Sequence, residues 1–456
     1  MSNKADSTNM KQAIKRELKP KLRFPEFRDA GEWDEKRLDE MFDFHSTANN
    51  SRADLSNAGN IFYIHYGDIH TKFHQYIDFS KDAIPKIPSS LYKNATFLKN
   101  GDLVIADASE DTEGIAKAVE VRGIEHGVKA ISGLHTILLR DSRQNYINGF
   151  KGLLREIAEV KKQIKRLAVG VKVYSVSKTV LKQVLLPLPS HPEQQKIADC
   201  LLSIDELITA QTQKLNTLKT HKKGLMQQLF PAEGETLPKL RFPEFLDSGE
   251  WETKQLGELL LGHPDYGVNA AAVTYSEDLP AYLRITDISE EGYFLCGKKA
   301  SVAIKATDEH YMSEGDIVLA RTGASVGKSY KFRKEDGKLV FAGFLIRIKP
   351  DPTKIDSTFL FNFLFTEQYW NWVRVTSARS GQPGINGNEY AALLIPVPPH
   401  VRESGGLSEQ LKIAECLSSI DELITTQTQK LDTLKTHKKG LMQQLFPALD
   451  EVQRWA

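Results

Sequence analysis

Residues 193–232 have the sequence EQQKIADCLLSIDELITAQTQKLNTLKTHKKGLMQQLFPA, and residues 409–448 repeat this sequence with five differences. Steps of four and three residues from Ile197 to Leu229 give ten positions, and eight of them are apolar. This spacing is typical of a coiled-coil seam rather than of the broader apolar face of a globular helix. Because a seam must be covered, we predict that each copy forms a helix of about 50 Å and packs against the other.

The predicted seam contains polar positions that bear on register. Its members are Ile197, Leu201, Ile204, Ile208, Gln211, Leu215, Leu218, Lys222, Leu225 and Leu229 in the first copy, and Ile413, Leu417, Ile420, Ile424, Gln427, Leu431, Leu434, Lys438, Leu441 and Leu445 in the second. Gln211 and Gln427 would fix the register by pairing with each other. The outer faces are also nearly identical, which suggests that two identical partner proteins bind them. Two ordinary core helices, each in its own globule, are the alternative.

A second repeat lies nearer the start of the chain. The sequence KLRFPEFRDAGEWDEKRLDE at residues 21–40 returns with six changes at residues 239–258. The chain therefore consists of two units of 218 residues each, 21–238 and 239–456.

The middles of the two units differ. Residues 41–192 and 259–408 resemble each other only in scattered pieces. Strands that end in polar residues are predicted at 61–69, 101–109, 281–289 and 315–323. Matched ends with unlike middles indicate one framework that carries two different recognition surfaces.

One stretch resembles a nucleotide site. LARTGASVGKSY at residues 319–330 has the Gly-Lys-Ser ending of a phosphate-binding loop, but Thr322 stands where the pattern requires its first glycine. The alternation after Ser329 and the Asp336-Gly337 pair predict a strand, a hairpin turn and a second strand, so no helix N-terminus faces the loop. We expect no nucleotide site here and keep a P-loop enzyme as an alternative hypothesis.

The bulk properties fit a soluble protein of two or three domains. The chain has 456 residues, of which 26% are charged and 41% hydrophobic, and its net charge is +1. No apolar run reaches membrane-spanning length, and the start of the chain lacks the apolar centre of a signal peptide, so a cytoplasmic location is expected. The three cysteines, Cys200, Cys296 and Cys416, indicate neither a disulfide framework nor a zinc site.

Basic residues gather in each middle. Arg321 to Lys349 contains eight bases and two acids, and Lys151 to Lys182 contains nine bases and two acids. Such stretches are typical of phosphate contacts, and solvated surface charge is the alternative. Amide side chains suit adenine and arginines suit guanine or phosphate. The predicted DNA-binding residues are Arg321, Thr322, Lys328, Lys331, Arg333, Arg374, Arg379, Gln382, Asn386 and Asn388 in the second half, and His65, Lys72, Lys172, Tyr174, Ser177 and Lys178 in the first.

Signs of catalysis are absent from the sequence. It contains no Asn-Pro-Pro-aromatic motif of adenine methylation and no Gly-x-Gly cofactor loop. His65, His70 and His74 have no common zinc spacing, so we interpret them as polar surface, with His65 able to touch DNA. Glu110 and Asp111 are interpreted as solvated loop acids. No catalytic or metal-binding residue is predicted.

Taken together, these motifs resemble the specificity subunit of type I restriction–modification systems. The resemblance covers nearly all of the chain beyond residue 20. It rests on the duplicated FPEF…GEW segment, GDIVLARTGASVGK, SGQPGIN followed by IPVPP, and the EQxKIAxxLxxID helix start. It implies two mixed α/β target recognition domains joined by two long antiparallel coiled-coil helices, with a pseudo-twofold internal repeat and a circular organisation. The predicted segments are an N-terminal extension (1–20), recognition domain 1 (21–192), a central spacer helix (193–232), recognition domain 2 (233–408), a C-terminal spacer helix (409–448) and a tail (449–456).

The resemblance also implies partners. Family members carry no catalytic residues and bind a bipartite double-stranded DNA target. They hold two methyltransferase subunits, which use S-adenosylmethionine to methylate adenine, and two restriction subunits, which use ATP and Mg. This chain is therefore expected to bind no cofactor itself. A coiled-coil adaptor whose middles bind proteins is kept as a further alternative.

Overall fold

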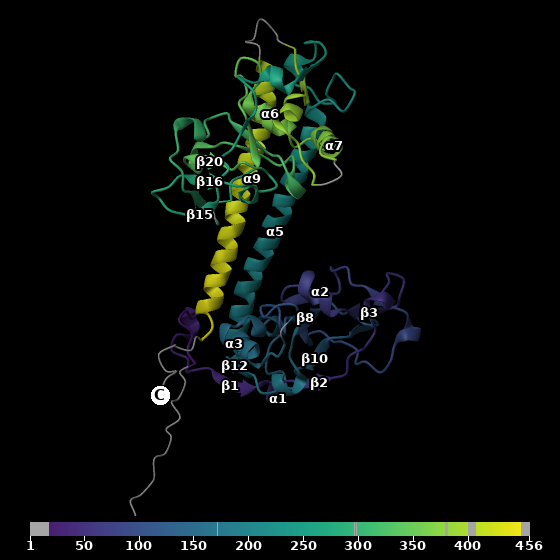
Figure 1. Cartoon of the computed structure of the whole chain (residues 1–456). Helices are drawn as coiled ribbons and strands as arrows, with labels where there is room; N and C mark the ends of the chain where they lie inside the picture. Colours follow the sequence, from purple (N-terminus) through teal and green to yellow (C-terminus); the bar gives the residue numbers. More distant parts are fainter. Residues whose placement is uncertain are drawn as a thin grey trace, which may run out of the picture. The chain divides into compact units, whose positions relative to one another are not determined.

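The computed structural model describes residues 18–170, 172–295, 297, 299–378, 382–399 and 407–447. The chain forms two compact units, which we call unit 1 (Met1–Gln211 with Lys430–Ala456) and unit 2 (Thr212–Gln429). Each unit combines one middle segment with one end of each long helix (Figure 1). The predicted segment boundaries, which lie at helix ends, stay a prediction.

Unit 1 is built on a five-stranded sheet with the order β2-β10-β6-β8-β4. The strands are β2 (Asp43–His45), β10 (Thr136–Arg140), β6 (Leu103–Ala106), β8 (Ala118–Arg122) and β4 (Tyr76–Asp78). Neighbours are antiparallel except for β4 and β8, which are parallel. A smaller sheet contains β5 (Lys86–Ile87), β3 (Ile61–Ile64) and β9 (Ala130–Ser132), and β7 (Ala108–Ser109) pairs with β11 (Tyr174–Ser175).

Unit 2 contains two four-stranded sheets. The first has the order β14 (Asp265–Tyr266), β21 (Leu345–Ile348), β18 (Ile317–Ala320) and β19 (Ser329–Lys331). The second has the order β15 (Ala272–Thr274), β17 (Ala300–Val302), β16 (Ala281–Leu283) and β20 (Leu339–Phe341).

The strands β6 and β18 hold equivalent places in the two units. Each is a run of four buried apolar residues, LVIA and IVLA, so both faces of the strand are covered. Alternate side chains of β6 enter two cores, and the core that takes Leu103 and Ile105 also contains Ile197 and Leu201 of the first long helix. In unit 2, Ile317 and Leu319 share a core with residues of both long helices. The long helices are therefore part of the hydrophobic core of each unit.

Two predicted strand details are wrong. β19 forms a hairpin with β18, whereas β20 lies in the other sheet and pairs in parallel with β16, so there is no hairpin at Asp336-Gly337. The predicted strands at 61–69 and 281–289 end at Ile64 and Leu283, and they are followed by α2 (Tyr66–Thr71) and by a 3-10 helix (Ile285–Asp287). The first error concerns a pairing with distant parts of the chain, whereas the second concerns helix caps that are local.

The two long helices are α5 (His191–Leu229) and α9 (Ser408–Gln444). In unit 1, Lys438 Nζ binds Asp205 at 2.6 and 2.8 Å, and in unit 2, Lys222 Nζ binds Asp421 at 2.7 Å to both oxygens. The start of α5 thus packs against the end of α9 in unit 1, and the end of α5 against the start of α9 in unit 2. The predicted antiparallel helix pair is confirmed.

The seam positions are sheltered from solvent. Every residue of the predicted seam is buried or partly buried, while Leu207, Leu411 and Leu423, which lie off the seam, are about half exposed. Two seam positions are lysines, Lys222 and Lys438, and these form the ion pairs described above. Gln427 is buried and Gln211 is partly buried, and their mutual pairing stays a prediction.

The duplicated segments 21–40 and 239–258 dock on helix ends. Leu22 N donates to Gln444 O at the end of α9, and Leu240 N donates to Gln228 O at the end of α5, both at 2.9 Å. Each segment also adds a strand: β1 (Asp34–Arg37) pairs with β12 (Leu185–Leu188), and β13 (Glu252–Gln255) pairs with β22 (Leu394–Val397). An early segment of the chain therefore closes on its C-terminal helix, which is the predicted circular organisation.

A buried ion pair anchors each docked segment. Arg23 binds Glu193 of α5 at 2.6 and 2.7 Å, and Arg241 binds Glu409 of α9 at 2.8 Å through two nitrogens. All four side chains are almost completely buried. Bidentate pairing of this kind fixes orientation as well as position.

The remaining helices are short, and the surface is polar. They are α1 (Leu38–Met41), α3 (Ala158–Leu167), α4 (Lys178–Leu181), α6 (Ser357–Phe363), α7 (Glu367–Thr376) and α8 (Gly387–Ala391). Within the described ranges, no helix is long and apolar enough to cross a membrane.

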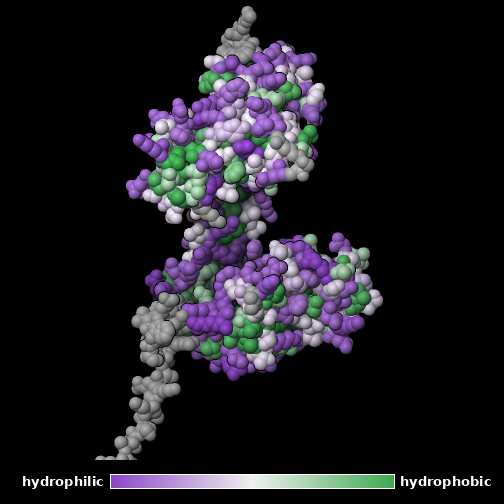
Figure 2. Space-filling model, in the orientation of Figure 1, coloured by the Kyte–Doolittle hydropathy of each residue, from purple (hydrophilic) through white to green (hydrophobic). Residues whose placement is uncertain are grey.

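The visible surface of both units is mostly hydrophilic, with scattered apolar patches (Figure 2). Cys200 and Cys416 are free thiols, and Cys296 lies outside the described residues.

Candidate nucleic-acid interface

The false phosphate loop is the connection of the β18–β19 hairpin. Its backbone pairs with the QPGIN segment: Thr322 forms a bridge with Gly384, Gly323 N donates to Pro383 O at 3.0 Å, and Ile385 N donates to Arg321 O at 2.9 Å. Two sequence motifs that lie 60 residues apart therefore form one surface in unit 2. We call this surface the unit 2 tip.

Gly327, which gave this loop its likeness to a phosphate site, has a structural role. Its φ is +87°, and a Cβ added there would lie 2.8 Å from the side chain of Val373 on α7. Only glycine fits both the backbone conformation and the packing. Tyr369, one turn earlier on α7, donates to Gly327 O at 2.6 Å and also holds the loop. No α-helix follows the loop, so the geometry offers no phosphate cradle.

Several predicted DNA-binding residues of unit 2 are engaged in the fold. Lys328 pairs with Glu290 at 2.7 Å, and Lys331 donates to Thr358 Oγ1 at 2.5 Å. Burial lowers the pKa of Lys331. Arg333 lies over the Tyr293 ring at 4.2 Å and donates to Gly292 O. These contacts hold the hairpin in place, so contact of these three residues with DNA stays a prediction.

Arg321 differs from these three because its side chain forms no hydrogen bond or ion pair in the described part of the chain. Its guanidinium lies 4.9 Å from the centre of the Tyr266 ring, and its Nε has no hydrogen-bond partner. The side chain is partly exposed. Stacking orients the charge and leaves it available to a ligand.

The amides of the QPGIN segment have unequal roles. Asn386 caps α8: its Oδ1 accepts from Glu389 N at 3.0 Å, while Glu389 Oε2 accepts from Asn386 N at 2.7 Å. This capping box occupies the side-chain oxygen that we had assigned to adenine. Gln382, Asn388 and Arg374 are exposed, Thr322 is partly exposed, and Arg379 lies outside the described residues.

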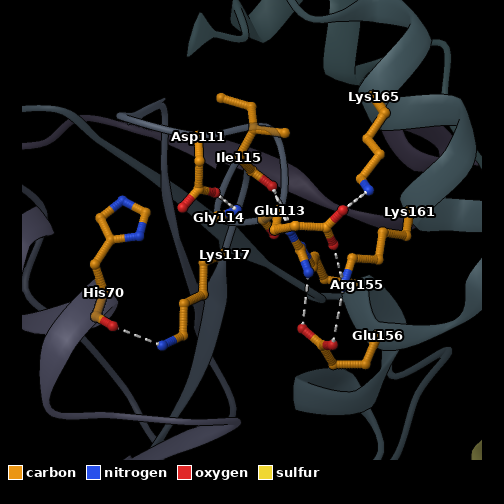
Figure 3. A network of polar contacts seen from close by, with 10 residues as sticks. All are labelled: His70, Asp111, Glu113, Gly114, Ile115, Lys117, Arg155, Glu156, Lys161 and Lys165. Atoms are coloured by element: carbon orange, nitrogen blue, oxygen red, sulfur yellow. Dashed lines mark hydrogen bonds and ion pairs between the residues drawn. The ribbon is translucent and has the colours of Figure 1, made fainter. Parts of the chain in front are cut away.

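In unit 1 the corresponding loop, residues 107–117, which we call the unit 1 tip, is held by basic side chains (Figure 3). Arg155 donates to the carbonyls of Glu113 and Ile115, and Lys165 and Lys161 bind the Glu113 carboxylate. Glu156 accepts from Arg155 at 3.0 Å. Part of the basic stretch between Lys151 and Lys182 therefore neutralises and fixes the loop.

Four other bases of that stretch are exposed, whereas Lys151 is buried and Lys162 is partly buried. Lys172 and Lys178, both predicted to bind DNA, are exposed, as are Arg166 and Lys182. Tyr174 lies in β11 and is partly exposed, and the Ser177 Oγ accepts from Val180 N to cap α4. A smaller basic surface than the sequence suggests is left for phosphates.

The prediction that His65 lies on polar surface is wrong. Its exposed fraction is 6%, and its Nδ1 accepts from Gly67 N at 3.0 Å at the start of α2. Burial, followed by the nearby Arg52 guanidinium, lowers the pKa of His65. The ring acts as a neutral helix cap. Lys72, directly after α2, is exposed and pairs with Asp68 at 3.0 Å. Among the described residues no cluster of His, Cys, Asp or Glu could hold a metal ion.

The sequence did not reveal which residues lie beside Asp107 and Arg321, which directly follow β6 and β18. In unit 1, Asp107 N donates to His135 O at 3.1 Å and Asp107 O accepts from Val176 N at 2.9 Å. In unit 2, Arg321 N donates to Phe344 O at 3.0 Å and Arg321 O accepts from Ile385 N at 2.9 Å. Asp107 and Arg321 are therefore structurally equivalent. The hydrogen bonds that join Asp107 to His135 and Arg321 to Phe344 could not be predicted from the sequences of these strands alone.

The comparisons with known proteins agree with this architecture. The model of the type I restriction modification DNA specificity domain matches residues 30–220 and 248–436. The chain is 26% identical over 292 residues to the type I restriction enzyme MjaVIII specificity subunit of Methanocaldococcus jannaschii. The aligned residues cover 61% of this chain and 64% of that protein. It is 22% identical over 376 residues to the StySPI specificity subunit of Salmonella potsdam, covering 79% and 76%.

Two solved structures share the fold. The S subunit of a type I restriction-modification system from M. genitalium has a TM-score of 0.57 at 14% identity, over 95% of this chain and all of that one. A chain from a structural study of the complex assembly and conformational transition of the type I R-M system has a TM-score of 0.51 at 15% identity, over 91% and 97%.

Two α/β units on one framework, with unlike tips, define a protein with two DNA-recognition domains. The chain belongs to the type I restriction–modification DNA specificity family and is a specificity subunit. Specificity subunits are non-catalytic components of these systems.

Proposed function

We propose that this specificity subunit selects a bipartite double-stranded DNA target, with one half-site bound by each unit. The observation that carries the proposal is the equivalence of the two tips: the same backbone hydrogen bonds present Asp107 in unit 1 and Arg321 in unit 2. Opposite charges at one structural position suit two different base sequences. Exposed basic residues such as Lys172, Lys178 and Arg374 would contact the phosphates and set the register.

The proposal includes partners for the long helices. The outer faces of the two helix copies are nearly identical, and each exposes a leucine at the same place: Leu207 is 50% exposed and Leu423 is 55% exposed. Equivalent exposed leucines suit two copies of one partner. We propose that these partners are two methyltransferase subunits, and that two restriction subunits join the assembly.

Chemistry in the complex belongs to those partners. We propose that they methylate adenine with S-adenosylmethionine and use ATP and Mg for restriction, while this chain binds no cofactor. The loop at Gly327 supports this division because its glycine is used for packing against Val373.

Two experiments test the proposed function. Mapping methylated adenines in the native genome, with and without this gene, is expected to show a two-part motif that depends on the gene. Retention of the assembled complex on a DNA column at about 0.1 M salt, and its loss at higher salt, would show phosphate contacts. A gene-independent methylation pattern, or retention that ignores salt, would contradict the proposal.

The partner proposal has its own test. Leu207→Asp together with Leu423→Asp is expected to abolish co-purification of the methyltransferase subunits. The control pair, Thr220→Ala with Thr436→Ala, changes exposed residues outside the seam and is expected to leave co-purification unchanged. Co-purification of the Asp variants at the wild-type level would place the partners elsewhere.

A further inference from the structure

The two tips share a geometry that extends to a second residue in each. Strand register pairs Ala106 with Thr136 in unit 1 and Ala320 with Leu345 in unit 2. The next residues outward are Asp107 facing His135, and Arg321 facing Phe344. Backbone hydrogen bonds of 3.1 and 3.0 Å join the members of each couple. Each unit therefore ends in a two-residue couple that is held by the same framework.

The couples are accessible, although their strands are buried. The side chain of Asp107 is 31% exposed and that of His135 is 50% exposed. Phe344 is 61% exposed, which is unusual for a large aromatic residue beside a buried strand. By contrast, Ala106 and Ala320, one residue inward, are completely buried. Exposure therefore begins abruptly at the couples.

Each couple is also held in a fixed arrangement. His135 Nδ1 lies 3.2 Å from Asp107 Oδ1, and the His135 ring contacts the Tyr66 ring edge-to-face, 5.3 Å between centres. His135 has a φ of +56°, a conformation that costs energy in most non-glycine residues. In unit 2 the Tyr266 ring orients Arg321. Asp107, His135 and Arg321 are therefore oriented by their neighbours, and exposed, chemically different side chains at equivalent positions are what sequence selection requires.

We propose that these couples are the base-selecting residues of the two half-sites; this inference rests on the proposed function. Arg321 donates two hydrogen bonds to the O6 and N7 of a guanine, and Phe344 contacts the methyl group of a neighbouring thymine. Asp107 accepts a hydrogen bond from the amino group of a cytosine. His135 is a positioning residue, because its Nδ1–H holds one oxygen of Asp107 and leaves the other for the base.

A guanidinium binds a backbone phosphate as well as a guanine base, so the experiment must distinguish these two ligands of Arg321. Lysine replaces arginine in a phosphate contact but not in a two-bond contact with guanine. Arg321→Lys in the full chain, co-expressed with its methyltransferase partners, is expected to relax one guanine position in one half-site by roughly ten- to a hundredfold. Uniform weakening for all sequences, with that guanine still required, would assign Arg321 to a phosphate and overturn its role as a base-selecting residue.

The unit 1 couple has matched variants. Asp107→Asn is expected to relax the cytosine position by a similar factor, whereas Glu110→Gln, which removes a charge from the same loop, is expected to leave the motif unchanged. His135→Ala is expected to weaken the cytosine preference, and His135→Asn to restore it, because asparagine donates to Asp107 and tolerates positive φ. Failure of His135→Asn to restore the preference would show that the ring has only a packing role.

The readout is the map of methylated sites for each variant, with the unfolding midpoint of each purified chain as the check on folding.

Phe344→Ala removes only an exposed side chain and so tests unit 2 without risk to the core. A several-fold loss of one thymine preference is expected. A gene-dependent two-part motif that no couple variant alters would overturn this inference and leave the proposed function intact. Absence of such a motif in the wild type would overturn both.

Discussion

Units 1 and 2 are most alike where they meet the long helices and least alike at their tips. Arg23 and Glu193 have the same arrangement as Arg241 and Glu409, with bidentate distances of 2.6 to 2.8 Å in both. At the tips, equivalent backbone positions carry residues of opposite charge. The framework has been kept under the constraint of packing, while exposed loop ends are free to vary. The contrast separates the residues that build the protein from those that select its ligand.

The largest expected effect comes from breaking the framework. Glu193→Ala or Glu409→Ala leaves a buried arginine unpaired, which costs about 3–5 kcal/mol in the free energy of unfolding. Trp33 Nε1 also donates to Glu193 at 3.0 Å, whereas Trp251 Nε1 has no partner. Glu193→Ala should therefore cost about 1 kcal/mol more than Glu409→Ala. Denaturant unfolding of both variants measures the difference, and equal losses would show that the tryptophan bond contributes nothing.

The two ion pairs between the long helices, Lys438–Asp205 and Lys222–Asp421, should show a smaller difference in stability. The Gln75 amide, oriented to satisfy its neighbours, donates to Asp205 at 3.0 Å and accepts from Lys438 at 3.1 Å. Lys438→Met is thus expected to cost about 1 kcal/mol more than Lys222→Met in denaturant unfolding. A Gln75→Leu change should then cost less in the background of Lys438→Met than in the wild-type chain, because one of its two hydrogen bonds is already lost. If both lysine variants lose the same stability, Gln75 does not support the pair.

Acid should affect the two units differently. His65 caps α2 with a pKa below its ordinary value, so the unfolded state binds the proton more tightly than the folded state. The stability of unit 1 should therefore fall as pH falls below about 6.5. His65→Asn keeps a capping side chain and is expected to reduce this dependence, with His74, whose pKa is also lowered, accounting for the rest. Unit 2 has Arg284 at the equivalent cap. Hydrogen exchange at pH 5.5 and 7.5, followed unit by unit, provides the measurement.

The smallest effects should come from Gly224 and Gly440, which lie inside α5 and α9. A Cβ added at either glycine meets nothing within 4 Å. Replacement by alanine should raise the midpoint of thermal unfolding, because glycine inside a helix costs roughly 0.5–1 kcal/mol. The two substitutions should have nearly equal effects. A loss of stability would indicate that the glycines permit a bend or a contact that alanine prevents.

The spacing between half-sites can be tested without altering either tip. Insertion of seven residues in each long helix keeps the apolar seam in phase and lengthens the pair by about 10 Å. The gap between half-sites is expected to increase by up to about three base pairs, while the selected bases stay the same. The methylation map of the variant gives both quantities, and a change in the bases themselves would refute the hypothesis that the helix pair sets the gap between the half-sites.

The sequence revealed the framework because its signals are local or repeated. The heptad spacing from Ile197 to Leu229 and the duplicated segments predict helices and docking without any knowledge of distant contacts. The tips depend on such contacts. Arg155 binds carbonyls some 40 residues away, so its charge was wrongly assigned to surface available for phosphate. Phe344 became visible as a tip residue only once the strand register was known.

The central claim is that one framework carries two independent recognition surfaces. The most direct test replaces residues 41–192 with a second copy of residues 259–408 and maps the methylated adenines in cells that produce this chain. We predict a target whose two half-sites carry the same bases, those of the original half-site of unit 2. Persistence of the original first half-site, or loss of all sequence preference in a folded chain, would contradict the claim.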